Sequence, residues 1–274
     1  MRKVKVSCPN IVIFTDLDGT LLSAEDYSWK DAEESLELCR KLGIPVVLVS
    51  SKTRAEIELI REEMDIKTPF VSENGGAIFL EKDEMPLEGA KFDGKYHRVE
   101  LGVPYNILVS ALKEIKNKLG WNIKGFSDMS VEEIAYLTGL DLSLAYLASL
   151  REYDEPFLIL NEIKDISPLV KMAESKGLKV FKGGRFYHIQ GKNDKGEAVQ
   201  ILKSWYKKDK GDIISVALGD SPNDFPMLMK VDYPVLITSQ KDYHPDIPNL
   251  KISRFPGPKG WNEEVLNIIQ KLCF

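Results

Sequence analysis

Short apolar runs alternate with amphipathic segments along most of this chain. The runs are rich in β-branched residues, which is typical of strands buried on both faces of a parallel sheet. We expect strands at residues 11–14, 45–49, 69–71, 213–218 and 233–237, and helices at residues 30–42, 53–64, 194–208 and 261–272. This alternation predicts an α/β fold with a parallel sheet.

The pattern changes between residues 82 and 190. Here we expect helices at residues 104–119, 130–138, 141–151 and 165–176, a strand at 157–160 and a pair of strands at 178–190. Turn-forming segments at 85–89 and 191–194 border this region. The sequence therefore predicts a core made of residues 1–82 and 191–274, interrupted by an inserted α+β domain of residues 83–190.

The composition is that of a folded, soluble protein. Its 274 residues suit one large or two modest domains, and 43% of them are hydrophobic and 29% charged. A net charge of −5 without a long Lys/Arg tract argues against a nucleic-acid surface. No stretch approaches the roughly 18–20 apolar residues of a membrane helix. Any cations that bind an anionic substrate must therefore be concentrated locally.

The cysteines and the first residues bear on the compartment. Cys8, Cys39 and Cys273 are odd in number, far apart and without CxxC spacing, so we expect neither a disulfide framework nor a zinc site. Residues 1–3 resemble the start of a signal peptide, but the apolar run after them is short and ends at Asp16 without a cleavage pattern. We interpret that run as a first strand and expect a cytoplasmic protein.

Two carboxylates follow the first strand, in the segment Asp16-Leu17-Asp18-Gly19-Thr20. Side chains alternate along extended backbone, so Asp16 and Asp18 would face the same side. Gly19 permits a sharp turn, and Thr20 can hydrogen-bond locally to hold it. Two neighbouring acids repel unless a cation lies between them, and Mg²⁺ prefers such oxygen ligands. An ordinary Asp-Gly turn is the competing interpretation.

Further polar residues stand where other strands end or helices begin: Ser50, Lys195, Asp220 and Asp224. The carboxyl ends of parallel strands meet at one edge, so these side chains can converge on a single crevice. A hydroxyl, an ammonium and carboxylates around a metal suit phosphoryl transfer, with aspartate as the nucleophile. Taken singly, each residue could instead cap a helix or lie in solvent.

In these motifs and their order the chain resembles the haloacid dehalogenase superfamily, with an insertion at the position of a Cof-type or sucrose-phosphatase-type cap. The resemblance implies a Rossmann-like, doubly wound core with a cap domain. It implies that Asp16 attacks phosphorus and that Asp18 protonates the leaving alcohol and then deprotonates water. Mg²⁺ would be held by Asp16, Asp18, Asp220 and Asp224, and the phosphoryl oxygens by Thr20, Ser50 and Lys195.

Within that superfamily, segments 50–53, 151–156 and 183–188 are most similar to the mannosyl-3-phosphoglycerate phosphatases. This similarity implies a small phosphorylated sugar as substrate and mannosylglycerate as product. Lys52, Arg185 and His188 are the candidate substrate-binding residues, because Arg suits bidentate contact with a carboxylate.

Other functions remain open from the residues alone. Another sugar phosphatase of the sucrose-phosphate or Cof-like type would share the core and cap. A phosphomutase would return the phosphoryl group to a sugar, whereas a dehalogenase does not need the second acid, Asp18. A non-enzymatic binding module has no physical reason to keep all four motifs together. The sugar, the oligomeric state and the physiological metal are not defined by the sequence.

Overall fold

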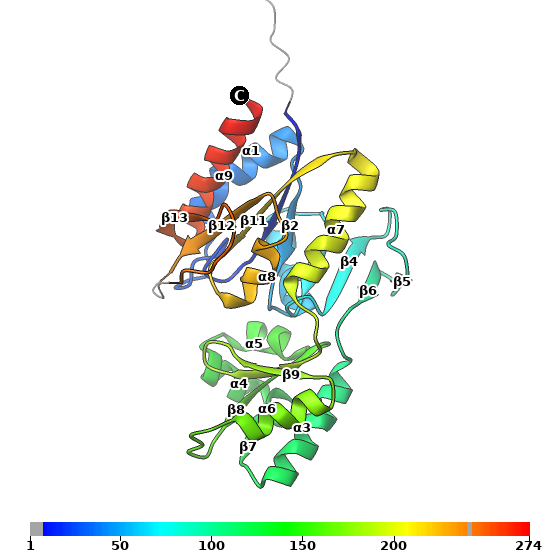
Figure 1. Ribbon diagram of the computed structural model, residues 1–274, viewed down its shortest axis with the longest axis vertical. Coiled ribbons are helices and arrows are strands. Elements are labelled where there is room, and N and C mark those ends of the chain that lie inside the picture. The colour runs from blue at the N-terminus through cyan, green and yellow to red at the C-terminus, as the bar shows by residue number, and fades with distance from the viewer. Residues whose placement is uncertain (1–7, 240–242) are drawn as a thin grey trace, which may run out of the picture.

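The computed structural model describes residues 8–239 and 243–274, so the segment 1–3 lies outside the described residues. The chain folds into two lobes that follow one another along the long axis in Figure 1. Among the described residues, the larger lobe contains a sheet of nine strands and the smaller lobe a sheet of four. This arrangement confirms the predicted α/β core with an inserted α+β region.

The larger sheet has the strand order β13-β12-β11-β1-β2-β3-β4-β6-β5. Its strands are β1 (Asn10–Thr15), β2 (Val46–Val49), β3 (Phe70–Ser72), β4 (Ala77–Glu81), β5 (Lys91–Phe92), β6 (Tyr96–Glu100), β11 (Ile213–Gly219), β12 (Tyr233–Thr238) and β13 (Lys251–Pro256). Neighbours are parallel from β13 to β3, whereas β4, β6 and β5 form an antiparallel edge. The sheet is therefore mixed, and sequence analysis had not predicted β13 or that edge.

Helices cover both faces of the larger sheet, as a doubly wound fold requires. They are η1 (Lys30–Ala32), α1 (Glu33–Leu42), α2 (Arg54–Glu63), α7 (Lys195–Lys210), η3 (Pro222–Asp224), α8 (Phe225–Leu228) and α9 (Gly257–Cys273). On one face, α1, α2 and α9 bury a cluster that includes Leu36, Ile57 and Trp261. On the other face, α7 and α8 bury Leu202 and Met227 against the same strands. Burial on both faces explains why these strands are continuous apolar runs.

The smaller lobe is built on an antiparallel sheet with the order β7-β8-β10-β9. Its elements are α3 (Tyr105–Leu119), β7 (Ile123–Gly125), η2 (Phe126–Asp128), α4 (Val131–Thr138), α5 (Leu142–Ser149), β8 (Asp154–Ile159), α6 (Ser167–Ser175), β9 (Lys179–Lys182) and β10 (Tyr187–Gln190). Apolar residues of α3 and α6 pack with the sheet in one cluster, and those of α4 and α5 form a second. The lobe thus has its own core.

The strands β5 and β6 follow residue 82, where sequence analysis placed the start of the inserted domain, yet they pair into the larger sheet. Both residues of β5 are exposed, and β6 is only partly buried or exposed after Tyr96, so neither strand has the apolar run or the alternation that indicates a strand. We propose that the inserted domain begins after β6, near Leu101, and ends at β10.

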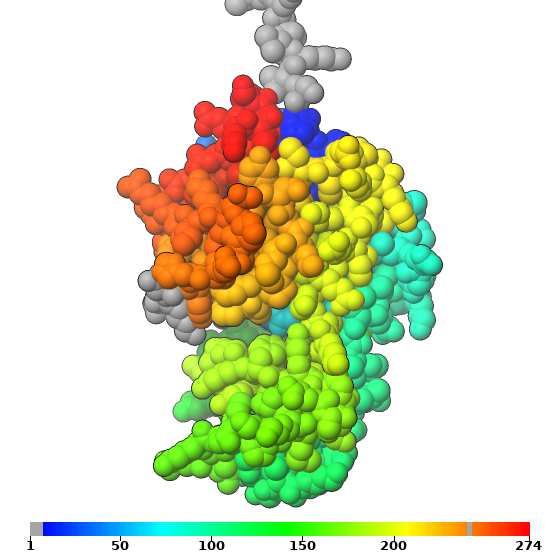
Figure 2. All heavy atoms as spheres, viewed as in Figure 1, coloured from blue at the N-terminus to red at the C-terminus, as the bar shows by residue number. Residues whose placement is uncertain are grey.

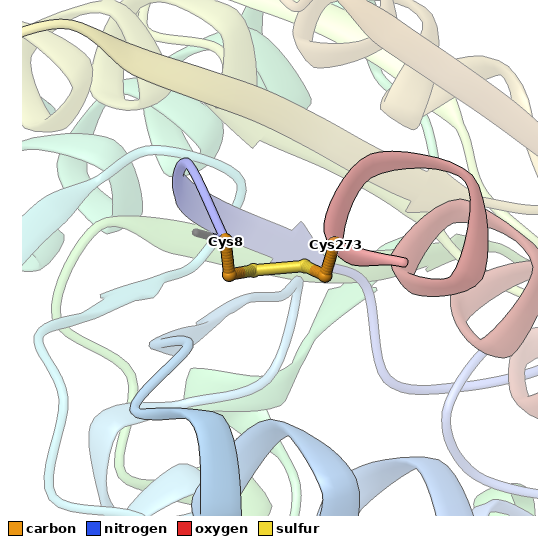
Figure 3. The surroundings of a disulfide bond; sticks show 2 residues. All are labelled: Cys8 and Cys273. Atoms are coloured by element: carbon orange, nitrogen blue, oxygen red, sulfur yellow. A yellow bond between two sulfur atoms is a disulfide. The ribbon is translucent and has the colours of Figure 1, made fainter. Parts of the chain in front are cut away.

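A disulfide joins Cys8 to Cys273, which corrects the expectation that this chain has none (Figure 3). Cys8 precedes β1 and Cys273 ends α9, and their Cα atoms lie 4.2 Å apart across a sequence separation of 265 residues. The sequence offered no spacing signal because this contact forms only when the last helix packs on the core. Cys39 remains free and buried. Separately, in the described part of the chain no helix has the length and apolarity needed to cross a membrane.

Closing so long a loop restricts the unfolded chain, so Cys273→Ser should lower the free energy of unfolding by roughly 4 kcal/mol. Chemical denaturation with and without reductant measures this loss, and reductant should have little further effect on the variant. Thiol titration of the unreduced, denatured wild type should find one reactive thiol per chain, that of Cys39. Three reactive thiols would contradict the disulfide.

Candidate active site

The carboxyl ends of the parallel strands place three polar loops around one crevice. Asp16 directly follows β1, and its N–H donates to the carbonyl of Leu218 on β11 (2.9 Å). Ser50 follows β2, and its N–H donates to the carbonyl of Val71 on β3 (3.0 Å). Asp220 directly follows β11. The predicted convergence of these strand ends is therefore present.

Lys195 is the first residue of α7, and it is completely buried. Its ammonium donates to Asp16 Oδ1 and to Asp224 Oδ1, at 2.6 Å in each case. Burial alone would lower the pKa of Lys195, but the two carboxylates outweigh that effect and raise it. Lys195 is therefore a fixed positive charge between two acids from distant parts of the chain.

Three acids share the space around this lysine. Oxygens of Asp16, Asp220 and Asp224 all lie within 4.8 Å of one another. Burial, followed by the charge of Asp224, raises the pKa of Asp16 well above its ordinary value and that of Asp220 to about 6. A divalent cation fits this cluster because it would offset charge that Lys195 alone does not neutralise.

Asp224 differs from the other two acids because both of its oxygens already accept hydrogen bonds. Oδ1 accepts from Lys195, and Oδ2 accepts from the N–H groups of Asp220 and Ser221, at 3.0 and 3.1 Å. The side chain therefore fixes the loop that carries Asp220. Gly219, just before that loop, has no room for a larger residue, because a Cβ there would lie 2.4 Å from the Cβ of Asp224.

The turn after Asp16 brings Asp18 to the rim of the crevice. Gly19 has φ +76°, and a Cβ there would lie 2.9 Å from Asp220 Oδ2, so the turn depends on glycine. The Asp18 side chain is 41% exposed, and Lys52 Nζ lies 3.0 Å from its Oδ1. Lys52, a predicted anion-binding residue, is thus paired with an acid of the site.

Two predicted phosphate-binding residues lie beneath the crevice rather than in its wall. Thr20 and Ser50 are completely buried. The Thr20 hydroxyl has no hydrogen-bond partner among the described residues, whereas Ser50 Oγ accepts the N–H of Lys52 at 3.2 Å. Ser51, which sequence analysis did not select, lines both of the cavities described next.

Two cavities open where the lobes meet, at the waist visible in Figure 2. The first, of about 550 Å³, is lined by the core residues Asp16, Asp18 and Lys195 and by His188 from the smaller lobe. The second, of about 390 Å³, is lined by Asp18, Lys52, Arg151, Arg185 and His188. The predicted catalytic residues therefore face the first cavity, and the predicted substrate-binding residues gather around the second.

Sequence analysis gave no place in the site to the residues that hold His188 and the loop beneath it, although Arg151 and Asp154 lie in the segment 151–156 that it singled out. His188 Nδ1 lies 2.7 Å from Oδ2 of the completely buried Asp154, and the imidazole stacks on Phe181. Arg151 donates to the carbonyl of Ser51 at 3.1 Å, which connects the smaller lobe to the core. An acid at the start of a buried strand, Asp154, was the available signal of a buried polar contact. Its partner His188 lies 34 residues away in the sequence, so the sequence does not identify the pair.

Comparison with known proteins gives consistent results. Residues 13–95 match the family model described as haloacid dehalogenase-like hydrolase. A glucosyl-3-phosphoglycerate/mannosyl-3-phosphoglycerate phosphatase from Persephonella marina is 46% identical over 96% of this chain and 98% of its own length. A mannosyl-3-phosphoglycerate phosphatase from Pyrococcus horikoshii is 38% identical over 84% of this chain and 91% of its own length.

A solved structure of a phosphatase of the HAD enzyme superfamily from Bacteroides thetaiotaomicron superposes with a TM-score of 0.65. The alignment covers 98% of each chain at 14% sequence identity, so this likeness bears on the fold alone.

The acid cluster predicts an unusual effect of Asp220→Asn on stability. The pKa of Asp220 rises from 3.8 to about 6 in the fold, so its ionised form destabilises the metal-free protein above that pH. In EDTA at pH 8 the variant should melt about 2–4 °C above the wild type, the shift expected for ~1 kcal/mol. The difference should shrink below pH 5, and Mg²⁺ should raise the Tm of the wild type only.

Asp232→Asn is the matched control, because Asp232 directly precedes β12, the strand that pairs with β11. Burial opposes ionisation of Asp232, but hydrogen bonds from Ser215 prevail and lower its pKa, so this variant should lose stability at pH 8. A fall in Tm for Asp220→Asn in EDTA, similar to that of the control, would contradict the account of the acid cluster.

Proposed function

This chain belongs to the haloacid dehalogenase-like family of phosphatases, and from that premise we propose that it hydrolyses mannosyl-3-phosphoglycerate and glucosyl-3-phosphoglycerate through an aspartyl-phosphate intermediate. The relatives that support this substrate match this chain over most of its length and bear these activities in their names. The observation that carries the chemistry is the buried contact of Lys195 with Asp16, because it holds a carboxylate beside a fixed cation at the mouth of a cavity.

In the proposed reaction Asp16 Oδ attacks phosphorus, and the bond from phosphorus to the 3-oxygen of the glycerate breaks. The leaving oxygen takes a proton from Asp18, which stands at the rim of the same cavity. Asp18 then takes a proton from water as that water attacks the phosphoryl group and releases Asp16. Lys195 offsets repulsion between Asp16 and the anionic substrate throughout. Ser50 is proposed to support the phosphoryl group through the loop that its hydroxyl stabilises, and Thr20 through its main-chain N–H, which donates to the carbonyl of Leu17 within the turn at 3.1 Å.

Mg²⁺ is the proposed cofactor. Asp16, Asp220 and the main-chain carbonyl of Asp18 would hold it, and Asp224 would orient this set because its oxygens already accept hydrogen bonds. When bound, the ion would supply positive charge to the phosphoryl oxygens. The support for this assignment is the excess of buried carboxylates over ammonium groups in the cluster.

The second cavity is the proposed binding site for the glycerate and sugar portions. It adjoins Asp18, and three cationic side chains line it: Lys52, Arg151 and Arg185. Lys52 and Arg151 are already paired with core groups, with Asp18 and with the carbonyl of Ser51 respectively. Arg185 is exposed and forms no ion pair among the described residues, so it is the side chain best able to bind a substrate carboxylate.

Release of inorganic phosphate without a bisphosphate activator would separate this function from that of a phosphomutase. We also propose a cytoplasmic location, which suits a phosphorylated sugar substrate. Disulfides are rare in most cytosolic proteins, so the oxidation state of Cys8 and Cys273 in extracts is the observation that tests this placement.

Asp16→Asn should reduce phosphate release by at least about a thousandfold, because the amide keeps the shape of the side chain but lacks the attacking charge. Phosphate release from both glycosyl-phosphoglycerates, followed with Mg²⁺ present, measures this effect. Asp212→Asn, an isosteric change at an exposed surface position, should retain full activity. Residual activity within tenfold of the wild type would remove Asp16 from the nucleophile role.

Arg185→Ala should raise KM for glycosyl-phosphoglycerates by about tenfold or more, as expected for loss of a charge-assisted contact. It should change KM for a small aryl phosphate much less, because that substrate has no carboxylate. Arg254→Ala, at an exposed position on β13, is the control and should leave both values unchanged. Equal changes on both substrates would exclude Arg185 from carboxylate recognition.

A further inference from the structure

The turn formed by residues 73–76 lies where both connections between the lobes meet. Its Gly76 carbonyl accepts the N–H groups of Leu101 and Gly102, at 2.9 and 2.8 Å, in the first connection. In the second connection, a Cβ on Gly75 would lie 2.2 Å from the carbonyl oxygen of Asp194. The main chain of this turn is thus in close contact with the segments that lead into and out of the smaller lobe.

Glu73 fastens the smaller lobe directly. One of its carboxylate oxygens accepts the N–H of Glu152 at 2.9 Å, and the other accepts the N–H of Tyr153 at 3.0 Å. Its side chain is completely buried, and its φ of 46° lies in the left-handed region that a glutamate rarely adopts. Burial raises the pKa of this carboxyl to about 8, although Arg151 opposes the rise. Glu73 thus keeps an unfavourable backbone conformation, and both of its side-chain oxygens accept backbone N–H groups of the smaller lobe.

Tyr153 shows how tightly this contact is packed. A Cβ on Gly76 would lie 2.5 Å from the Cβ of Tyr153, and one on Gly102 would lie 2.9 Å from it. The Tyr153 hydroxyl donates to Glu100 on β6 at 2.8 Å. The start of β8 is therefore enclosed by the turn, the first connection and the edge of the larger sheet, and the two bonds to Glu73 hold it there.

Asn74, the next residue, faces the crevice instead. Its Oδ1 accepts from Asn223 Nδ2 at 3.1 Å, and its N–H donates to the carbonyl of Ser50 at 2.9 Å. Asn223 precedes Asp224, which fixes the loop of Asp220. Asn74 also lines the larger cavity. One turn thus contacts the smaller lobe through one side chain and the acid cluster's loop through its neighbour.

We propose that Glu73 and Asn74 are positioning residues that couple the placement of the smaller lobe to the geometry of the phosphoryl site. Glu73 holds the start of β8 so that His188 and Arg185 stand over the crevice. Asn74 holds the loop of Asp220 and Asp224 in register with Ser50. The part of this inference that concerns the sugar substrate rests on the proposed function, whereas the mechanical part does not.

Hydrogen exchange tests the mechanical part without any substrate. Glu73→Gln keeps the shape of the side chain but sets an NH₂ group against one of the two backbone N–H donors. The amides of Glu152 and Tyr153 should then exchange about tenfold faster or more than in the wild type. Glu81→Gln is the matched control, because Glu81 pairs with Arg61 at the edge of the same sheet, and it should leave these amides unchanged. Equal protection in wild type and Glu73→Gln would overturn the proposal.

Kinetics test the coupling. Glu73→Gln should lower kcat/KM for glycosyl-phosphoglycerates about tenfold more than for a small aryl phosphate, whereas Asn74→Ala should lower kcat on both. Equal losses on both esters for Glu73→Gln, or full activity of Asn74→Ala, would contradict it. If the wild type hydrolyses only the aryl phosphate, the proposed substrate is wrong, and the exchange data together with Asn74→Ala still decide the positioning role.

Discussion

The structure of the crevice depends on the pairing of the buried Lys195 ammonium with two carboxylates. Lys195 lies at the start of α7 and contacts Asp16 after β1 and Asp224 after β11, each at 2.6 Å. An unpaired charge at a completely buried position costs several kcal/mol, so each of the three groups requires the others. The same contacts that make the loops compatible with folding place an oxygen of Asp16 beside a cation, as the proposed attack on a phosphoryl group requires.

In the proposed function the two lobes bind different parts of the substrate. The larger lobe supplies buried acids and the lysine, which suit a phosphoryl group, and it contributes Asp18 to both cavities. The smaller lobe adds Arg185 and a histidine whose orientation is fixed by Asp154 and Phe181. Because these groups come from separate cores, their relative placement must be set by a few contacts at the connections, and the turn at residues 73–76 carries several of them.

Sequence reasoning succeeded where the signal is local. Apolar runs marked β1, β2 and β11 to within about two residues, because burial on both faces requires continuous hydrophobicity. The residues at their ends could then be grouped by the rule that parallel strands share an edge. It failed for β13, an edge strand that is largely exposed and ends in proline.

The remaining differences are non-local. The Cys8–Cys273 bond joins segments that are 265 residues apart, and the hydrogen bonds from two amides to Glu73 join segments about 80 residues apart. No spacing pattern in the sequence predicts either contact. Lys52 shows the same limit, since its pairing with Asp18 follows from the turn at Gly19 rather than from the segment in which Lys52 lies.

The proposed mechanism depends on Asp16 as the nucleophile. Its most direct test is rapid acid quenching of the wild type during turnover of an aryl phosphate, followed by peptide mass spectrometry. A phosphoryl adduct on Asp16 is the predicted result, and an adduct on another residue, or none under conditions of active turnover, would contradict it.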